Sequence, residues 1–413
     1  MKILLSHPTG NQFVRALTKA LSDEQLLSEF HTTIAVDSDS HWLKLLPDSI
    51  KKEFLRRTYP IPSTQIHTHP LIELARFILP KIGLKDFVKH ETGWASVDAV
   101  YRNLDGKVAD RIICLNKSTK PDAVYAYEDG AVSSFIEAKK LGIECLYDLP
   151  IGYWRASRQL LITERERWPD WAVTLPGFLD SEAKLERKDK ELRLADKIFV
   201  ASSFTEKTLE YFPGELPPVK VIPYGFPPVY EKRSYSVNLS SSRPLKIIFV
   251  GGLSQRKGIA DLFEAVKVFG DRVELTVVGN KTTSDCPALN QALDIHRWIP
   301  SLPHEGILQL MREHDLLVFP SLFEGFGLVI TEAMAQGTPV ITTDRTAGPD
   351  IIKDGENGWL IQAGSTEKLV SAIENILMRP VQIADAGKKA METAKKRPWE
   401  VYGQELLNEI VHN

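Results

Sequence analysis

Short apolar runs alternate with longer segments of helical periodicity along most of the chain. In the first half, runs with the length of a buried strand occupy Lys2–Ser6, Thr32–Val36, Ala123–Tyr127, Glu144–Tyr147 and Lys197–Ala201. Apolar residues three and four positions apart in Phe13–Leu21 and Val132–Lys140 predict helices between or beside these strands. Strands that alternate with helices are typical of parallel α/β units.

The alternation is interrupted from Pro227 to Pro244, where prolines and a serine run are typical of a linker. It restarts with strands and helices expected at Leu245–Val250, Gly258–Val268, Val273–Val278, Ile307–His314, Leu316–Pro320, Thr331–Gln336 and Pro339–Thr342. We therefore expect an α/β protein with two doubly wound, Rossmann-like domains, residues 1–228 and 229–397, that face a central cleft. Ligands of such sheets bind beyond the carboxyl ends of the strands, and here that means in the cleft.

The composition is that of a globular protein in a reducing compartment. The chain has 413 residues and a formal net charge of -3, so its total charge predicts no polyanionic partner such as nucleic acid. The cysteines, Cys114, Cys145 and Cys286, have no CxxC spacing and make no disulfide framework. The first apolar run is too short for a signal peptide and no stretch is long enough to cross a membrane, which favours a cytoplasmic location.

The strand that ends at Pro320 is followed by a glycine-containing loop and a helix. Because glycine has no Cβ, backbone N–H groups of this loop can approach a ligand closely. The helix directs its own free N–H groups and its positive end to the same point. We expect Gly325, Phe326, Gly327 and Leu328 to contact sugar hydroxyls or phosphate oxygens there.

Two carboxylates belong to this segment, Glu324 in the loop and Glu332 in the helix. A carboxylate accepts two hydroxyl hydrogen bonds at once, which suits the adjacent diols of a ribose or a hexose. The alternative is that Glu324 caps the helix and Glu332 is a solvated helical residue. The spacing alone does not separate these two readings.

A second strand, glycine turn and helix start lies at Ile247–Gly258. The charge of a diphosphate group can be met by Lys, Arg and helix N-termini when no metal is present. Arg256 and Lys257 are in the position to do this, beside Gly252. The alternative is a pair of solvated basic residues.

Two loops of the first half are candidates for the opposite wall of the cleft. Gly10 follows the first strand and lets the backbone face the cleft; the alternative is an ordinary turn. Asp148 follows another strand and either binds a hydroxyl or caps the next turn. Tyr153 and Trp154 either stack on an acceptor sugar or pack in the core.

The tripeptide Asp37-Ser38-Asp39 has the form of a metal-binding DxD motif, but a three-residue match is weak and we interpret it as a polar turn. The basic residues between Trp42 and Pro60 and the apolar stretch Leu71–His90 suit an anionic membrane surface or a solvated helix face. The membrane reading puts the protein at the inner face of the membrane, with a peripheral contact through residues 42–90.

The pattern EGFG-(x)4-EA-(x)3-G, from Glu324 through Glu332 to Gly337, resembles glycosyltransferase family 4, a group of retaining enzymes with the GT-B fold. The stretch Asp354–Leu360 is similar to the family's DGxNGxL turn. The resemblance implies that Glu324 contacts the transferred sugar and that Glu332 holds the ribose hydroxyls of the nucleotide.

The glycine turn before Gly258 is similar to the family's GRLxxxKG element, and Lys257 matches its phosphate-binding lysine. The family's arginine falls on Gly252, which supplies no charge, so we predict that Arg256 takes over this role. A second departure is Asp148, which stands where many members have a sugar-binding histidine, so that role is not carried over.

The resemblance implies a retaining, metal-independent transferase with Glu324, Lys257 and Asp148 as the catalytic candidates and no cofactor besides the nucleotide diphosphate sugar. Its donor binds the second domain, and its acceptor, a glycan or lipid-linked glycan of cell-surface polysaccharide or glycolipid synthesis, binds the first. A final helix, about residues 398–413, is expected to pack back on the first domain. The alternatives are a GT-B nucleotide-sugar epimerase or hydrolase, for which Asp148 is the obvious acid or base, and a non-catalytic sugar-nucleotide-binding protein.

Overall fold

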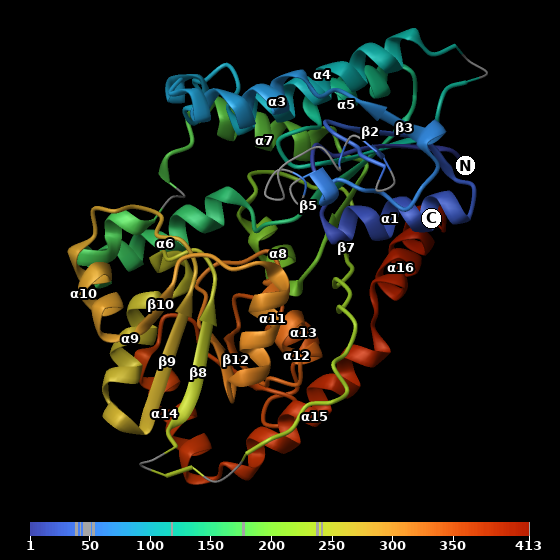
Figure 1. Cartoon of the computed structure of the whole chain (residues 1–413). Helices are drawn as coiled ribbons and strands as arrows, with labels where there is room; N and C mark the ends of the chain where they lie inside the picture. Colours follow the sequence, from blue (N-terminus) through green and yellow to red (C-terminus); the bar gives the residue numbers. More distant parts are fainter. Residues whose placement is uncertain are drawn as a thin grey trace.

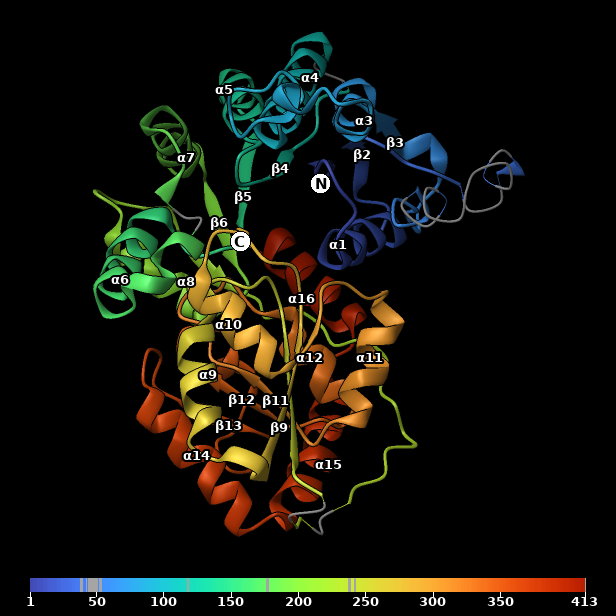
Figure 2. The same cartoon turned by 60° about the vertical axis from the view of Figure 1, so that its left-hand side comes forward.

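A computed structural model describes residues 1–37, 40–41, 43, 51, 54–116, 119–175, 178–236, 239–240 and 243–412. Two parallel sheets, each covered by helices on both faces, form two bodies that meet along one side (Figures 1 and 2). We call the body of the first sheet domain 1 and that of the second sheet domain 2. The chain passes from one sheet to the other between residues 222 and 244, a stretch that contains the predicted boundary.

Domain 1 contains a sheet with the strand order β3-β2-β1-β4-β5-β6-β7, all pairs being parallel. Its strands are β1 (Ile3–Ser6), β2 (Leu27–Thr32), β3 (Ile66–Thr68), β4 (Ala123–Tyr127), β5 (Glu144–Leu149), β6 (Lys197–Val200) and β7 (Val219–Val221). Its helices are α1 (Gln12–Asp23), α3 (Leu71–Ile78), α4 (Val97–Cys114), α5 (Val132–Lys140), α6 (Trp154–Arg167), α7 (Glu182–Leu194) and α8 (Ser203–Thr208), with 3₁₀ turns η2 (Ser63–Gln65), η3 (Leu79–Ile82), η4 (Lys85–Val88), η5 (Pro169–Thr174) and η7 (Leu209–Tyr211).

Domain 2 contains a sheet with the order β10-β9-β8-β11-β12-β13, again parallel throughout. Its strands are β8 (Leu245–Val250), β9 (Val273–Val278), β10 (Arg297–Ile299), β11 (Leu316–Phe319), β12 (Val340–Thr343) and β13 (Trp359–Ile361). Its helices are α9 (Ile259–Lys267), α10 (Pro287–Ile295), α11 (His304–Glu313), α12 (Leu328–Ala335), α13 (Gly348–Ile351), α14 (Thr366–Met378) and α15 (Val381–Lys396), with 3₁₀ turns η8 (Gln255–Lys257) and η9 (Gly270–Arg272).

One predicted strand of domain 1 is wrong. The apolar run Thr32–Val36 was expected to be the second strand, but the strand β2 ends at Thr32 and the rest of the run is a loop. Ile34 and Val36 are nevertheless buried, in a small apolar cluster with Leu43. A short apolar run indicates that a segment is buried, but burial alone does not distinguish a strand from an irregular segment.

The last helix, α16 (Trp399–Val411), leaves domain 2 and packs against α1 of domain 1 (Figure 1). The crossing is held at its start by Arg397, which pairs with Glu405 and donates to the main-chain oxygen of Pro223. The two helices approach closely at Gly403, where a Cβ atom would lie 2.8 Å from the main-chain oxygen of Ala16.

We predict that Gly403→Ala destabilises the protein, because the added methyl group forces α16 away from α1. The expected loss is about 1–3 kcal/mol in the free energy of unfolding, measured by denaturant titration. Gly106→Ala in α4 is the matched control, since a Cβ at Gly106 meets no atom within 4 Å. It should stabilise the protein by up to about 1 kcal/mol through helix propensity. Equal effects of the two variants would contradict this account of the helix crossing.

Candidate active site

Two cavities open where the domains meet. The first, the Glu324 cavity, has a volume of about 350 Å³ and is lined by Arg256, Lys257, Glu324 and the glycine loop that follows β11. The second, the arginine cavity, has a volume of about 630 Å³ and is lined by Gly10, by arginines of domain 1 and by Glu332. Leu328 lines both cavities, so they are neighbours at the start of α12.

The Glu324 cavity contains a buried ion cluster. Arg256 Nη1 lies 2.8 Å from Oε1 of Glu324, and the amine of Lys257 binds the same oxygen. The hydroxyl of Ser321 donates to this oxygen from 3.1 Å. The other carboxylate oxygen, Oε2, has no hydrogen-bond partner in the described part of the chain. Two cations thus share one carboxylate, which leaves an excess of positive charge and one oxygen for a ligand.

Burial and ion pairing shift the pKa values of this cluster in opposite directions. Burial raises the pKa of Glu324, but the charges of Lys257 and Arg256 outweigh it and the pKa is lowered overall. Burial also lowers the pKa of Lys257, and the attraction of Glu324 offsets this only in part. The amine of Lys257 additionally lies 4.9 Å from the centre of the Phe319 ring. An anion that enters the cavity would meet charges that are already desolvated and fixed.

Glycines bring the motif segments together. A Cβ at Gly258 would lie 2.0 Å from the main-chain oxygen of Pro320, so only glycine lets η8 lie against the end of β11. Gly258 also has φ +68°, a conformation that favours glycine. At Gly325 a Cβ would lie 1.9 Å from the main-chain oxygen of Pro150, so the loop of domain 2 touches domain 1 there.

Ser202 and Thr205 of domain 1 contact the glycine loop, although they are not among the predicted site residues. Their hydroxyls donate to the main-chain oxygen of Gly325 from 2.5 Å and 3.0 Å. They therefore hold the glycine loop against domain 1. Their position directly after β6, at the edge where the cleft is expected, was the signal that could have identified them.

The Glu324 cavity is lined by the loop residues that were predicted to contact a ligand, namely Gly325, Phe326, Gly327 and Leu328. Gly327 has φ +89° and precedes the first residue of α12. The first turn of this helix contains no acidic side chain that would offset the positive end of the helix, and Leu328 and Val329 of this turn line the cavity. Gly252 does not line either cavity and is exposed, and a Cβ atom there would meet no other atom within 4 Å. Arg256, in contrast, reaches the cavity.

Glu332 and Gly10 meet in the arginine cavity, from opposite domains. His304, at the start of α11, lies 2.9 Å from Oε1 of Glu332, and this hydrogen bond raises the pKa of His304. A Cβ at Gly10 would lie 3.0 Å from the ring of Tyr59, so the turn is packed tightly. The sequence analysis predicted neither the contact of His304 with Glu332 nor that of Tyr59 with Gly10.

Asp148 lines neither cavity. Its carboxyl group is 3% exposed and accepts a hydrogen bond of 2.6 Å from Tyr125. Burial raises the pKa of Asp148 to about 7, against the effect of the Tyr125 hydrogen bond. Tyr153 and Trp154, the other candidates of this loop, both donate to Asp189 of α7 and thus follow the packing alternative.

The expected polar turn at Asp37-Ser38-Asp39 includes two residues, Ser38 and Asp39, outside the described part of the chain. Much of the expected basic run before Pro60 lies outside it too. The described Arg56 and Arg57 line the arginine cavity, so the reading of this run as a membrane patch does not apply to them.

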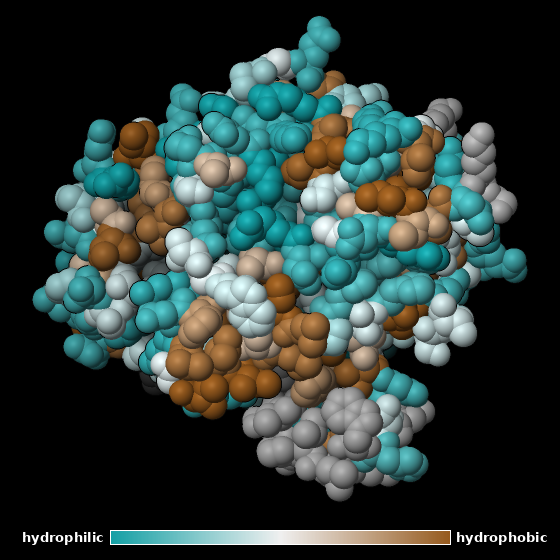
Figure 3. All heavy atoms as spheres, turned by 90° about the horizontal axis from the view of Figure 1, so that it is seen from above, coloured by the Kyte–Doolittle hydropathy of each residue, from teal (hydrophilic) through white to brown (hydrophobic). Residues whose placement is uncertain are grey.

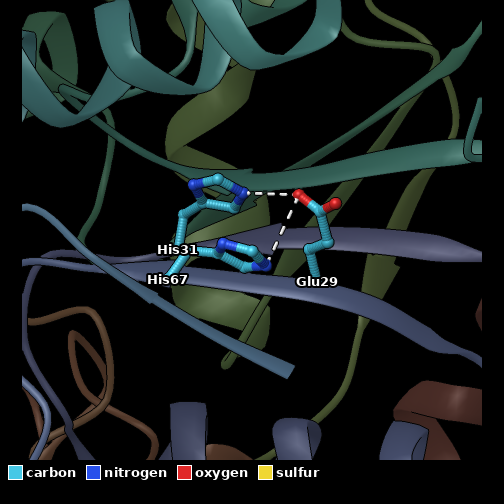
Figure 4. Close-up of side chains that lie close together, drawn as sticks. All are labelled: Glu29, His31 and His67. Carbon is cyan, nitrogen blue, oxygen red and sulfur yellow. Dashed lines mark hydrogen bonds and ion pairs between the residues drawn. The ribbon is translucent and has the colours of Figure 1, made fainter. Parts of the chain in front are cut away.

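Three side chains of types that can bind a metal ion lie together at the outer edge of the domain 1 sheet, where His31 and His67 point toward Glu29 (Figure 4). His31 Nε2 lies 2.9 Å and His67 Nε2 lies 3.9 Å from Oε2 of Glu29. Arg111 of α4 donates to both oxygens of this carboxylate, and its positive charge opposes a cation there. The cluster is satisfied as a hydrogen-bond network between α4 and the sheet, and it lines neither cavity.

Several known proteins are similar in sequence to part of this chain. Residues 232–397 match the family model described as glycosyl transferases group 1. A D-inositol 3-phosphate glycosyltransferase of Rhodococcus erythropolis is 30% identical over 174 residues, which are 41% of this chain and 34% of that protein. A glycogen synthase of Mycobacterium tuberculosis is 24% identical over 68% of this chain and 65% of its own length. These matches cover less than two thirds of the relatives' own length.

The whole chain is similar to solved structures. Sucrose-phosphate synthase from Thermosynechococcus elongatus superposes with a TM-score of 0.67 at 19% identity, over 99% of this chain and 98% of that chain. The Anabaena protein HepE, solved with UDP and glucose, superposes with a TM-score of 0.64 at 17% identity, over 99% of both chains. The chain therefore has the GT-B fold, and residues 232–397 match the model of the glycosyl transferases group 1 family.

Proposed function

We propose that the protein is a retaining glycosyltransferase of family 4 that transfers a sugar from a nucleotide diphosphate sugar to a hydroxyl group. The observation that carries the proposal is the buried cluster of Glu324, Lys257 and Arg256 at the start of α12. A sugar diphosphate needs a hydroxyl-binding carboxylate beside a concentrated positive charge, and this cavity offers both. The Anabaena protein that was solved with UDP and glucose makes UDP the first nucleotide to test.

The charged groups of the Glu324 cavity account for the steps of the proposed sugar transfer. The acceptor hydroxyl attacks the anomeric carbon from the side of the leaving group, and the bond to the diphosphate oxygen breaks. The departing phosphate oxygen takes the hydroxyl proton, so no protein base has to contact the acceptor. Lys257 and Arg256 stabilise the negative charge that develops on the diphosphate, in place of a metal ion. Glu324 orients the sugar, Glu332 binds the ribose, and the closed cleft keeps water from hydrolysing the donor.

The alternative of an epimerase requires a protein acid or base in contact with the sugar. Asp148 is the carboxyl group that this reading would use, yet it is buried beside Tyr125 and lines neither cavity. The non-catalytic alternative would use the same cluster to hold a sugar nucleotide, so release of the nucleoside diphosphate is the measurement that separates it from the transferase.

An apolar surface with basic residues supports a peripheral membrane contact on the cytoplasmic side, where a glycan or lipid-linked acceptor of cell-surface polysaccharide or glycolipid synthesis would be met. Large hydrophobic side chains between residues 71 and 94 are exposed: Leu71, Ile78, Ile82, Leu84, Phe87 and Trp94. Lys81, Lys85 and Lys89 are exposed among them, and hydrophobic patches are visible on this face of domain 1 (Figure 3). No helix of the described chain has the length and apolarity to cross a bilayer. Apolar side chains with interspersed lysines suit the surface of an anionic membrane.

We expect Lys257→Ala to lower the rate of donor turnover by about 10²–10³-fold, since one of the two charges that stabilise the leaving group is lost. Turnover is measured as release of the nucleoside diphosphate from a panel of UDP-, GDP- and ADP-sugars. Lys267→Ala removes an exposed lysine of α9, 76% accessible in its side chain, and should keep full activity. Wild-type turnover in a folded Lys257→Ala protein would refute the assignment.

Asp148→Asn should stabilise the protein at neutral and alkaline pH and leave donor turnover intact. The folded-state pKa of about 7 exceeds the ordinary value of 3.8, so the cost of ionising the buried carboxyl is absent below about pH 4, grows between about pH 4 and 7, and is constant at higher pH. A shift of this size corresponds to roughly 4 kcal/mol at most. Thermal unfolding from pH 4 to 8 measures the gain, with Asp110→Asn, 70% exposed, as the control. A large loss of turnover in folded Asp148→Asn would favour the epimerase reading.

The double variant Ile82→Ser/Phe87→Ser should bind vesicles of phosphatidylglycerol several-fold more weakly in a sedimentation assay, because the inserted apolar area is lost. Val268→Ser/Ile295→Ser is the control, since these side chains are exposed by 61% and 79% on domain 2. Binding of the unaltered protein should also weaken with salt, as the lysines contribute through charge. Equal binding by both double variants would remove the support for this surface.

A further inference from the structure

The arginine cavity has a wall of positive charge that the donor chemistry does not use. Arg15, Arg56, Arg57 and Arg76 of domain 1 line it, and we call these four residues the arginine wall. They come from α1, from the chain before η2 and from α3, so the fold assembles them from separate segments. Opposite them stand Glu332 and His304 of domain 2.

Fixed partners hold part of the arginine wall in place. Arg57 Nη2 lies 2.7 Å from Glu73 Oε1, and Arg76 binds the same carboxylate through two hydrogen bonds of 2.9 Å. Both guanidinium groups also lie over the Phe77 ring, at 4.9 Å and 4.7 Å from its centre. Glu73 is only 1% exposed. Glu73 therefore holds both guanidinium groups in fixed positions.

Arg15 adds charge without a carboxylate of its own. Within the described residues, its guanidinium donates to main-chain oxygens of Thr58, at 3.0 Å, and of Arg56. Burial lowers the pKa of Arg15, which means that its charge is already desolvated. Gly10 and Asn11, directly before the first turn of α1, line the same cavity, and that turn contains no acidic residue. Arg15 therefore adds a desolvated positive charge beside the N-terminus of α1.

We propose that the arginine wall binds a phosphate group carried by the acceptor, so that the acceptor is a phosphorylated sugar, a phosphorylated polyol or a phospholipid headgroup. The inference rests on the proposed function, because it takes the acceptor to bind domain 1. Guanidinium groups recognise phosphate oxygens in pairs. A volume of about 630 Å³ accommodates a sugar phosphate beside the ribose expected at Glu332.

The position of the wall favours the acceptor over the donor as the source of the phosphate. The donor diphosphate has its own cations, Arg256 and Lys257, which lie in the other cavity and on domain 2. The two cavities meet at Leu328, so a phosphate on the arginine wall would place the rest of its molecule next to the transferred sugar.

The test measures binding of inorganic phosphate, glucose 6-phosphate, glucose and dihexanoyl phosphatidic acid to the full chain by calorimetry. The chain is saturated with whichever of UDP, GDP or ADP stabilises it most. We expect inorganic phosphate to bind and glucose not to bind. A preference for glucose 6-phosphate identifies a soluble acceptor, and a preference for the phosphatidic acid identifies a lipid source.

Arg56→Gln/Arg76→Gln should weaken phosphate binding by about tenfold to a hundredfold, because two charge-assisted contacts are lost, while nucleotide binding is unchanged. Arg102→Gln removes an arginine of α4 whose side chain is 55% exposed and should behave as the unaltered chain. If the double variant unfolds, Arg56→Gln alone, at an exposed position, replaces it.

Two outcomes would overturn the inference. One is that phosphate and both phosphorylated compounds bind no better than glucose. The other is that phosphate competes with the nucleotide and the double variant loses both, which would assign the wall to the donor. In either case nucleotide binding that depends on Lys257 leaves the proposed function standing, whereas the absence of any nucleotide binding defeats the proposed function itself.

Discussion

The buried pairing of Lys257 and Arg256 with a single oxygen of Glu324 is the interaction on which the site depends. Charges removed from water are costly unless partners are close, so the three groups hold η8 and the loop after β11 in one arrangement. The excess cation cannot be neutralised from within the cluster. The site is thus stable enough to fold and still electrostatically incomplete, which is the state in which a protein binds an anionic ligand strongly.

That cluster could not form without close main-chain contacts. Gly258 lets the turn that carries the cations lie against Pro320, and Gly325 lets the loop that carries the carboxylate touch domain 1 at Pro150. Ser202 and Thr205 then bind the main-chain oxygen of Gly325. The glycines of the motif therefore serve two purposes: they expose N–H groups to a ligand, and they permit the approach of the two domains.

The two walls of the cleft differ in their chemistry. Domain 2 supplies the carboxylate and the cations of the Glu324 cavity, whereas domain 1 supplies guanidinium groups that are held by Glu73 and Phe77. Such a division suits a reaction between two substrates, each held by one domain.

Much of the strand pattern followed from local sequence, since β4, β8 and β9 have the predicted bounds. These strands are buried along their length, and their apolar runs are the right size for a central strand. The loop after Thr32 and the burial of Asp148 were missed for a related reason. Both are decided by what packs against them, an apolar cluster in the first case and Tyr125 in the second.

The sequence by itself determined the α/β architecture with two domains, because hydrophobic period and glycine placement are local properties. It also singled out Glu324 and Glu332, which belong to one motif, and Lys257, which belongs to a second, as candidate site residues. Only the tertiary structure decided that Arg256 reaches the cavity, that Asp148 does not, and that arginines from separate segments form one wall. Those facts depend on distances between residues far apart in the chain, and such distances are set by packing and buried charge, which no local pattern encodes.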